Sequence, residues 1–298
     1  MTVEWIAVDW GTTNLRAFAM GRDGIVAQST SDDGMGRLDR DGFEPALLHL
    51  IDPWLTEGRV TEVIACGMVG SRQGWHEAPY RAVPCTPLDP ATLVTAPTRD
   101  GRIRVRLVPG LKQVQPADVM RGEETQIAGV LALRQGFDGV VCLPGTHSKW
   151  AHLSAGEVVS FQTFLTGEMF ALLSQASVLR HGLQGDGWDE AAFDAAVSDA
   201  LSRPERIGAR LFSIRAEGLI AGLAAASARA RLSGLLIGME LAAARPYWLG
   251  QAVVIVGSEA ISASYARALK GLGVEARVVK GGDAVLAGLL MTRAKVNA

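Results

Sequence analysis

Two short turns in this sequence carry the residue types that bind anionic oxygen atoms. In the first, Asp9 ends an apolar run and is followed after one residue by Gly11, Thr12 and Thr13. Gly11 lets the backbone bend tightly and approach a ligand, while successive amides and the threonine hydroxyls donate to phosphate-type oxygens. A carboxylate at the end of a buried strand is well placed to hold hydrated Mg²⁺ beside those oxygens. The spacing predicts a phosphate-binding turn, with an ordinary hairpin turn and a solvated Asp9 as the alternative.

A second turn repeats this chemistry later in the chain. It contains Gly145, Thr146, His147, Ser148 and Lys149, again directly after an apolar run. The hydroxyls, the imidazole and the ammonium group can all donate to anionic oxygens. One Gly-Thr turn is weak evidence, but two at the ends of equivalent strands predict donors for both ends of a triphosphate.

The elements around both turns follow one pattern, in which an apolar strand leads into the turn and a hairpin follows. Alternation and turn glycines predict strands over 5–10, 15–20, 25–27, 60–66, 140–143, 150–153, 158–161, 252–256 and 274–279. Helical spacing predicts helices over 44–55, 118–133, 169–179, 190–201, 216–230, 232–244, 259–270 and 283–291. Strands alternate with helices in both halves, which predicts a mixed α/β architecture with two related lobes, over 1–115 and 116–298.

The helix predicted over 118–133 is the one that bears most on chemistry. Pro116 precedes it, and Asp118 is a favourable N-cap residue because its side chain can accept a bond from a free backbone amide. A helix N-terminus also favours negative charge. Asp118 is therefore expected as a carboxylate at the start of this helix.

Composition excludes several classes of protein. Of 298 residues, 48% are hydrophobic, which supports a sizeable core. The 29 Lys and Arg and 31 Asp and Glu give a formal charge of -2, without the excess basic charge that nucleic acid or anionic membranes require. No apolar run approaches the roughly 18 residues of a membrane span, and the amino terminus lacks the basic region of a signal peptide. Three cysteines without paired spacing favour reduced thiols, so we expect a soluble, cytoplasmic protein.

Common ligand motifs are also missing from the sequence. It contains no GxxxxGK[ST], no GxGxxG after a strand, no HExxH, no GxSxG and no zinc-type cysteine pair. The P-loop, dinucleotide, zinc-protease and serine-hydrolase interpretations therefore lose their usual support.

Three segments resemble the phosphate and adenosine motifs of the sugar kinase, actin and Hsp70 superfamily. Residues 9–13 with Arg16 are similar to the first phosphate motif, residues 145–149 to the second, and residues 254–258 with the following helix to the adenosine motif. More narrowly, essentially the whole chain resembles the 2-dehydro-3-deoxygalactonokinases. The segments that carry this resemblance are GMVGSRQGW (67–75), DVMRGEETQ (118–126), LPGTHSKW (143–150) and TGEM (166–169).

The resemblance implies a fold and a reaction. The fold is two related lobes of the ribonuclease H-like, actin-like ATPase type, each a mixed sheet with helices on both faces, with a nucleotide cleft between the lobes. The reaction is ATP-dependent phosphorylation of 2-dehydro-3-deoxy-D-galactonate at its 6-hydroxyl, with ATP as co-substrate and Mg²⁺ as cofactor. The alternatives are a kinase for a related sugar or sugar acid, such as 2-dehydro-3-deoxygluconate, and a non-kinase ATPase of the same fold.

The resemblance also implies a role for several residues. Kinases of this superfamily commonly use an aspartate that opens the helix before the second phosphate turn as proton acceptor, and Asp118 matches that position. Glu123 and Glu124 are its rivals. Arg72 is the best candidate to grip the substrate carboxylate, because a guanidinium can donate to it bidentately, and Trp75 could pack on the carbon skeleton.

The remaining expected contacts lie on both lobes. Arg16 and Glu168 are expected to contact substrate, and Gly257 and Ser258 to form the turn beneath the adenine or ribose, where close backbone approach needs glycine. The expected partner is a small sugar acid, with no nucleic acid and no membrane. The preferred epimer, a homodimeric state, the choice of metal and any regulation stay open.

Overall fold

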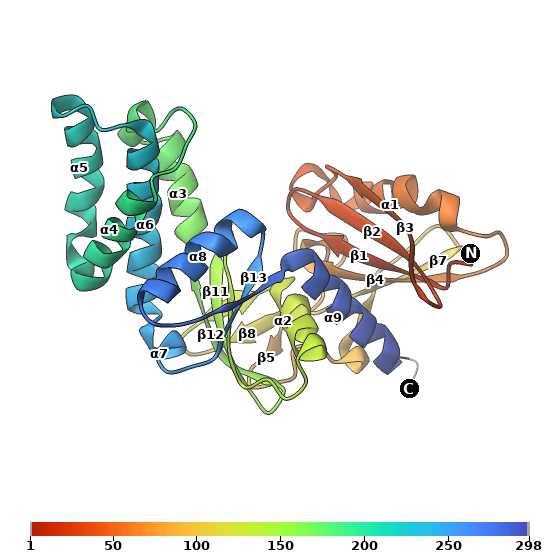
Figure 1. Ribbon diagram of the computed structural model, residues 1–298. Helices are drawn as coiled ribbons and strands as arrows, with labels where there is room; N and C mark the ends of the chain where they lie inside the picture. The colour runs from red at the N-terminus through yellow and green to blue at the C-terminus, as the bar shows by residue number, and fades with distance from the viewer. Residues whose placement is uncertain (1, 297–298) are drawn as a thin grey trace. The chain divides into compact units, whose positions relative to one another are not determined.

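The computed structural model describes residues 2–296 of the chain (Figure 1). These residues form two compact units. The first unit combines residues 2–137, 154–160 and 281–296, and the second combines 138–153 and 161–280. The division differs from the one expected at residues 115 and 116, because the chain leaves the first unit later and returns to it at the end.

The main sheet of the first unit has the strand order β3-β2-β1-β4-β7-β6. Its strands are β1 (Trp5–Trp10), β2 (Leu15–Gly21), β3 (Gly24–Ser31), β4 (Thr61–Gly67), β6 (Val94–Thr95) and β7 (Ile103–Leu107). The first three form an antiparallel meander, while β4 and β7 run parallel to β1. The central strand β1 is almost entirely buried, as its nearly continuous apolar run predicts for a parallel strand covered on both faces.

The sheet of the second unit has the order β12-β11-β10-β13-β14. Its strands are β10 (Gly139–Leu143), β11 (Ser148–Ser154), β12 (Glu157–Phe164), β13 (Val253–Gly257) and β14 (Arg277–Lys280). The first two strands pair antiparallel, and β13 and β14 then run parallel to β10. In each sheet, the first strand (β1 or β10) therefore has the next two strands of the chain on one side. On its other side lie strands that run parallel to it, β4 and β7 or β13 and β14. This repeated topology confirms the expected α/β fold of two related lobes.

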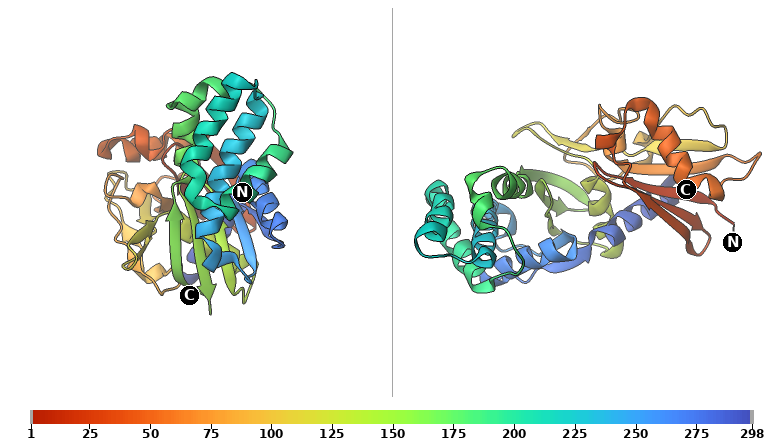
Figure 2. Two further views of the ribbon diagram at one scale, coloured as in Figure 1. Left: turned by 90° about the vertical axis from the view of Figure 1, so that its left-hand side faces the viewer. Right: turned by 90° about the horizontal axis from the view of Figure 1, so that it is seen from above.

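Helices cover these sheets in both units. They are α1 (Phe43–Ile51), α2 (Glu123–Leu133), α3 (Thr166–Gln175), α4 (Glu190–Ser202), α5 (Ile207–Ile220), α6 (Ala225–Ala243), α7 (Arg245–Trp248), α8 (Glu259–Gly271) and α9 (Gly281–Val296). In the first unit α2 and α9 lie side by side (Figure 1). In the second unit α3, α4, α5 and α6 gather into a bundle, which both views of Figure 2 show.

The core of the first unit places aromatic side chains behind the first turn. Trp10 packs against Phe43, with ring centroids 5.1 Å apart, and against Trp75 at 6.2 Å. All three are buried with the apolar side chains of β1, β4 and α1. The loop that contains Trp75 is thereby anchored to the strand that carries Asp9.

Three predicted helices, 118–133, 216–230 and 232–244, differ from the structure. Residues 118–120 form strand β9 (Asp118–Met120), which pairs with β8 (Leu111–Gln113) in a small sheet with β5 (Arg81–Ala82), and α2 begins only at Glu123. The break expected near residue 231 is absent, because α6 is continuous and the chain turns at 221–224 instead. In both places the helical spacing of apolar residues continues across a turn in the sequence, so it did not reveal the turn. The turns contain Gly122 and Gly222, which both have positive φ.

Among residues 2–296, no helix has the length and apolar character that crossing a membrane would require.

Candidate active site

The first phosphate turn follows β1 directly and is held by backbone bonds. The amide of Gly11 donates to the carbonyl of Asn14 at 2.9 Å, and Met35 donates to the carbonyl of Gly11 at 3.0 Å. Thr12 and Thr13 remain exposed. The turn is therefore fixed from behind while its hydroxyls face solvent, as an anion-binding turn requires.

Asp9 and Arg16 form an ion pair beside this turn. They face each other because Asp9 of β1 is registered with Arg16 of β2 across an antiparallel pair. The Asp9 side chain is 16% exposed and that of Arg16 39%. The thiol of Cys66, on the neighbouring strand β4, lies 3.9 Å from Oδ1 of Asp9. Both predicted site residues are thus brought to one place, at the carboxyl end of β1.

Asp9 presents a carboxylate, which is a kind of ligand that Mg²⁺ takes in proteins. Among the described residues, no three His, Cys, Asp or Glu side chains group into a metal site of their own. Mg²⁺ is commonly held by one or two carboxylates together with substrate phosphates and water. Arg16 bonds Oδ2 and the Cys66 thiol lies against Oδ1, so Oδ1 is the oxygen whose neighbour here is uncharged.

The N-terminus of α2 reaches the same edge of the sheet. Gly122 has a φ of 103°, and a Cβ at this position would lie 3.4 Å from the Cα of Gly67, the last residue of β4. Glycine is therefore needed for the turn, where φ is positive, and the backbones of Gly122 and Gly67 are in ordinary contact. The turn brings Glu123 and Glu124 next to the strand ends that carry Cys66 and Trp10.

These two carboxylates sit in different environments. Glu123 is partly exposed and accepts a bond from the amide of Arg121 at 3.0 Å. Glu124 is fully buried and accepts bonds from the amide of Gly122 at 2.6 Å and the hydroxyl of Thr125 at 3.0 Å. Burial, reinforced by the charge of Glu123, raises the pKa of Glu124 to about 7. Of the two, only Glu123 presents an accessible carboxylate.

Asp118 does not occupy the helix start that the sequence predicted for it. It lies in β9 opposite Gln113, and its carboxylate accepts a bond from the neighbouring amide of Val119 at 2.7 Å. β9 ends at Met120, so Asp118 lies four residues before Gly122 and outside α2. The N-cap of α2 is Gly122. Asp118 therefore does not have the helix N-terminus that was expected to stabilise its negative charge.

The segment after β4 places Arg72 and Trp75 very differently. The Arg72 side chain is 83% exposed and lies only 4.0 Å from the carboxylate of Glu77, while Arg40 holds the Arg72 carbonyl at 3.0 Å. Trp75 is 4% exposed and belongs to the aromatic core. Arg72 is thus available to a ligand. Trp75 positions the loop from behind, and its expected packing against substrate is corrected to a structural role because it has almost no exposed surface.

Arg121 is a residue whose role sequence reasoning missed. Its guanidinium is buried, donates to the carbonyl of Ala78 at 2.7 Å and lies over the Tyr80 ring at 4.3 Å. Within the described part of the chain, its Nε and Nη1 atoms have no hydrogen-bond partner. The only signal was its place in the segment 118–126. It ties the end of β9 to the loop that carries Arg72.

The second phosphate turn is braced by the start of α3. A Cβ at Gly167 would lie 2.2 Å from the carbonyl oxygen of Gly145, so the two backbones touch. The amide of Glu168 donates to the carbonyl of Thr146 at 2.9 Å. The carboxylate of Glu168 bonds Nε2 of His147 at 2.6 Å, with both side chains nearly half exposed. The predicted residues of this turn are therefore brought together, with Glu168 orienting His147.

A cavity of about 290 Å³ opens beside this turn in the second unit. Gly145, Gly167, Ser258 and Tyr265 are among the residues that line it. Its apolar walls come from Phe170, Trp188, Leu236, Ile237 and Ile261. Gly257 is next to Ser258, at the end of β13 and the start of α8. The cavity combines an apolar slot with a phosphate turn, which suits a nucleoside carrying phosphates.

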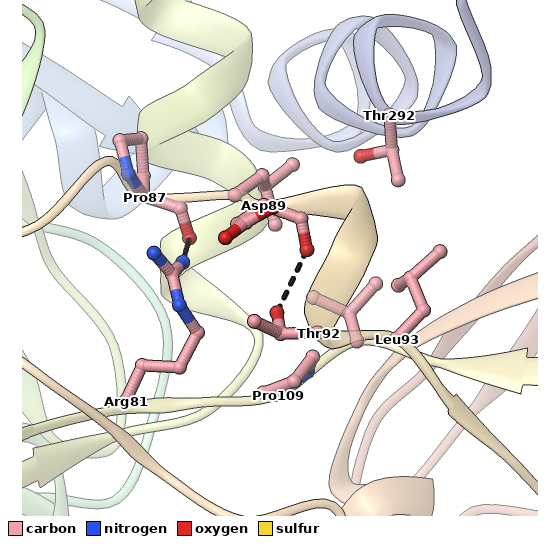
Figure 3. Close-up of a pocket in the computed structure, with 9 residues that line it drawn as sticks. Arg81, Pro87, Asp89, Thr92, Leu93, Pro109 and Thr292 are labelled. Carbon is pink, nitrogen blue, oxygen red and sulfur yellow. Dashed lines mark hydrogen bonds between the residues drawn. The ribbon is translucent and has the colours of Figure 1, made fainter. Parts of the chain in front are cut away.

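Another hollow, in the first unit, carries no comparable chemistry. Arg81 donates there to the carbonyl of Pro87 at 3.5 Å, and Thr92 donates to the carbonyl of Asp89 at 2.7 Å (Figure 3). Arg81 also donates to the carbonyl of Thr86 at 2.8 Å. The interior leaves no room for a water molecule. This hollow is a packed contact between residues 81–93 and α9.

Comparison with known proteins gives a consistent result. The family model described as 2-keto-3-deoxy-galactonokinase matches residues 9–292. The chain is 34% identical over 292 residues to the 2-dehydro-3-deoxygalactonokinase of Escherichia coli (strain K12), covering 97% of each. It is 41% identical over 296 residues to a Rhizobium meliloti (strain 1021) protein named as a probable 2-dehydro-3-deoxygalactonokinase, covering 96% of this chain and 95% of the other.

A solved structure agrees with these sequence relatives. The crystal structure of a Sinorhizobium meliloti protein with the same 2-dehydro-3-deoxygalactonokinase designation superimposes with a TM-score of 0.91 at 38% identity. The match covers 98% of this chain and 99% of the other. The similarity therefore extends through both units.

Proposed function

The chain belongs to the 2-keto-3-deoxy-galactonokinase family, and from this we propose that it transfers the γ-phosphoryl group of ATP to the 6-hydroxyl of 2-dehydro-3-deoxy-D-galactonate. The product is 2-dehydro-3-deoxy-6-phosphogalactonate. The observation that carries the proposal is the family match over residues 9–292, together with two Gly-Thr turns on equivalent strands.

The two turns and the cavity support ATP as the phosphoryl donor. Phosphoryl transfer depends mainly on alignment and on neutralising charge, for which fixed backbone amides and hydroxyls are suited. Thr12 and Thr13 offer hydroxyls on one unit, and Thr146 and His147 offer donors on the other. The cavity beside Ser258 has the volume and the apolar walls that suit a purine nucleoside.

Mg²⁺ is proposed as the ion that accompanies ATP. When bound, such an ion neutralises charge on the transferred phosphoryl group. Asp9 would hold it from the protein through Oδ1, while Arg16 keeps the carboxylate oriented through Oδ2.

Arg72 is proposed to bind the carboxylate of the sugar acid. Its side chain is exposed and weakly paired, while its backbone is anchored through Arg40 and the buried Trp75. A guanidinium on a fixed loop can recognise a carboxylate with little loss of backbone freedom.

Glu123 is proposed as the acceptor of the hydroxyl proton, in place of Asp118. Glu123 stands at the N-terminus of α2, beside the strand ends that carry Asp9 and the first turn. Its carboxylate is partly exposed, unlike that of Glu124, so it can reach a substrate. Asp118 lies further back on β9.

Three free cysteines, Cys66, Cys85 and Cys142, support a cytoplasmic location, where thiols stay reduced.

ADP release in the presence of ATP and Mg²⁺ tests the proposal. The acceptors are 2-dehydro-3-deoxygalactonate, its gluconate epimer, galactonate, galactose and buffer alone. We expect turnover with the keto-deoxy acids, fastest with the galactonate compound. Preference for the gluconate epimer would favour the related-kinase alternative, and ADP release without any acceptor would identify an ATPase and overturn the proposal.

A further inference from the structure

A buried glutamate in the second unit connects elements that surround the cavity. Glu240 of α6 is 1% exposed, and the three side chains that donate to it, described next, are uncharged. Oε1 accepts the indole N–H of Trp150 at 2.7 Å, and Oε2 accepts the hydroxyl of Tyr265 at 2.6 Å and the hydroxyl of Thr166. The three donors come from β11, α8 and α3, so a single carboxylate joins four elements.

The chemistry of the donor groups fixes the direction of each hydrogen bond to Glu240. An indole N–H can only donate, so Trp150 must donate to Glu240. Ser148 lies 2.9 Å from the Tyr265 oxygen, and when Tyr265 donates to Glu240 its oxygen is left to accept from Ser148. The whole chain of bonds therefore points toward the carboxylate, and none of its groups is left without a partner.

This network adjoins the cavity but is not part of its surface. Thr166 and Tyr265 line the cavity, whereas Glu240 does not. Thr166 is the first residue of α3, and the next two residues, Gly167 and Glu168, are those that touch the second phosphate turn. A displacement of Thr166 would therefore move the turn as well as the cavity wall.

Moving the Glu240 carboxylate out of water costs desolvation free energy. Burial raises the pKa of Glu240, while bonds from Thr166, Tyr265 and Trp150 oppose the rise. Apolar side chains could fill the same space without the cost of desolvating a charge. A carboxylate adds directional acceptors at fixed positions, which apolar packing cannot supply.

We propose that Glu240 is a positioning residue for the nucleotide, which holds the cavity wall at Tyr265 and, through Thr166, the second phosphate turn in their binding geometry. This inference rests on the proposed function for its ligand, ATP. It concerns how the ligand is held and assigns Glu240 no contact with it.

Glu240→Gln tests this inference, because glutamine keeps the size of the side chain but turns one acceptor oxygen into a donor NH₂. At least one of the three donors then loses its acceptor. We expect the KM for ATP, and the Kd of a non-hydrolysable ATP analogue measured by calorimetry, to rise about 10-fold or more, as for loss of a hydrogen bond to a charged group. The KM for the sugar acid should stay within about twofold. Glu217→Gln is the matched control, since Glu217 also bonds α6, through Arg231, but lies outside the cavity lining.

Thr166→Val provides a second route that does not disturb the charge. If Glu240 acts through Thr166, Thr166→Val alone should weaken nucleotide binding, and the double variant should be hardly worse than Glu240→Gln. An unchanged affinity for the analogue in folded Glu240→Gln or, where that variant does not fold, in Thr166→Val, would overturn the inference. A wild-type protein that binds the analogue but phosphorylates no sugar acid would instead contradict the proposed function and leave this inference standing.

Discussion

At the residue scale, three carboxylates lie near the first phosphate turn, and their surroundings separate their roles. Asp9 is paired with Arg16, Glu123 is partly exposed at a helix start, and Glu124 is buried behind it. A carboxylate that is oriented and reachable suits proton transfer, whereas a buried one suits holding the backbone. The buried Glu124 does this by accepting the amide of Gly122, which forms the turn into α2.

Glu123→Gln should lower kcat by about two to four orders of magnitude, the usual range for losing a general base. The amide oxygen can still accept from the backbone of Arg121, so the turn should persist and the affinity for ATP should hold. Asp118→Asn is the matched comparison and should retain most of the activity. Steady-state kinetics of the two variants decides between them, and the reverse ranking would return the role to Asp118.

Arg72→Ala should raise the KM for the sugar acid about 10- to 100-fold, because a charge-assisted bond to the substrate carboxylate is lost. The KM for ATP should change little. Arg99→Ala is a closely matched control, since the Arg99 side chain is equally exposed, at 83%, and also pairs weakly with one acid, Asp41. Equal effects of the two substitutions on the sugar-acid KM would place the carboxylate site elsewhere.

Glu124→Gln should change how stability depends on pH. The pKa of Glu124 is about 7 in the folded chain, and its ordinary value is 4.5. Below pH 4.5 both states are protonated. Between pH 4.5 and pH 7, Glu124 is ionised in the unfolded chain but still protonated in the folded chain, so the free energy of unfolding falls as pH rises. Above pH 7 the folded protein has lost the full contribution of Glu124, on the order of 3 kcal/mol.

Glutamine removes this titration while its amide can still bond Gly122 and Thr125. Relative to wild type, Glu124→Gln should therefore gain stability between pH 5 and pH 8, by up to about 3 kcal/mol. Denaturant unfolding at the two pH values measures the difference. A difference between variant and wild type that does not change with pH would argue against a raised pKa at Glu124.

At the element scale, the pair α2 and α9 closes the first unit. A Cβ at Gly129 of α2 would lie 1.8 Å from the carbonyl oxygen of Ala284 in α9, and a Cβ at Gly288 would lie 2.1 Å from that of Thr125. The helices thus meet backbone to backbone at two points. Because α2 also starts beside the first turn, this close contact helps to set the position of Glu123.

Gly129→Ala should destabilise the protein by roughly 1–3 kcal/mol or more, as expected for overpacking a close helix contact. Gly208→Ala is the control, because Gly208 also lies in a helix, α5, but has open space at its Cβ position. There alanine should be neutral or stabilising by about 0.5–1 kcal/mol. Thermal or denaturant unfolding measures both, and similar effects at the two positions would contradict the packing described for α2 and α9.

At the scale of the whole molecule, one topology is used twice. Each unit has a first strand that ends in a Gly-Thr turn, a hairpin strand beside it and parallel strands on its other side. The two units differ in the side chains and elements that they carry. The first carries the carboxylates and Arg72, and the second carries the cavity and the helical bundle.

The sequence by itself determined the elements whose signal is local. The apolar runs at 5–10 and 140–143, the turns that follow them and the hairpin glycines at 24 and 156 were predicted correctly, because strand burial and tight turns depend on neighbouring residues. The repeated order of strands and the four resembling segments were enough to predict the two related lobes and the family.

Only the tertiary structure decided which side chains meet. The start of α2 moved from Asp118 to Glu123 because residues 118–120 pair with β8, a contact that no local pattern signals. Trp75 became a core residue and Glu240 a buried junction for the same reason, since burial depends on elements far away in the sequence. Local propensity specifies the elements of this protein, whereas long-range pairing and burial determine the environment, and hence the chemistry, of each charged side chain.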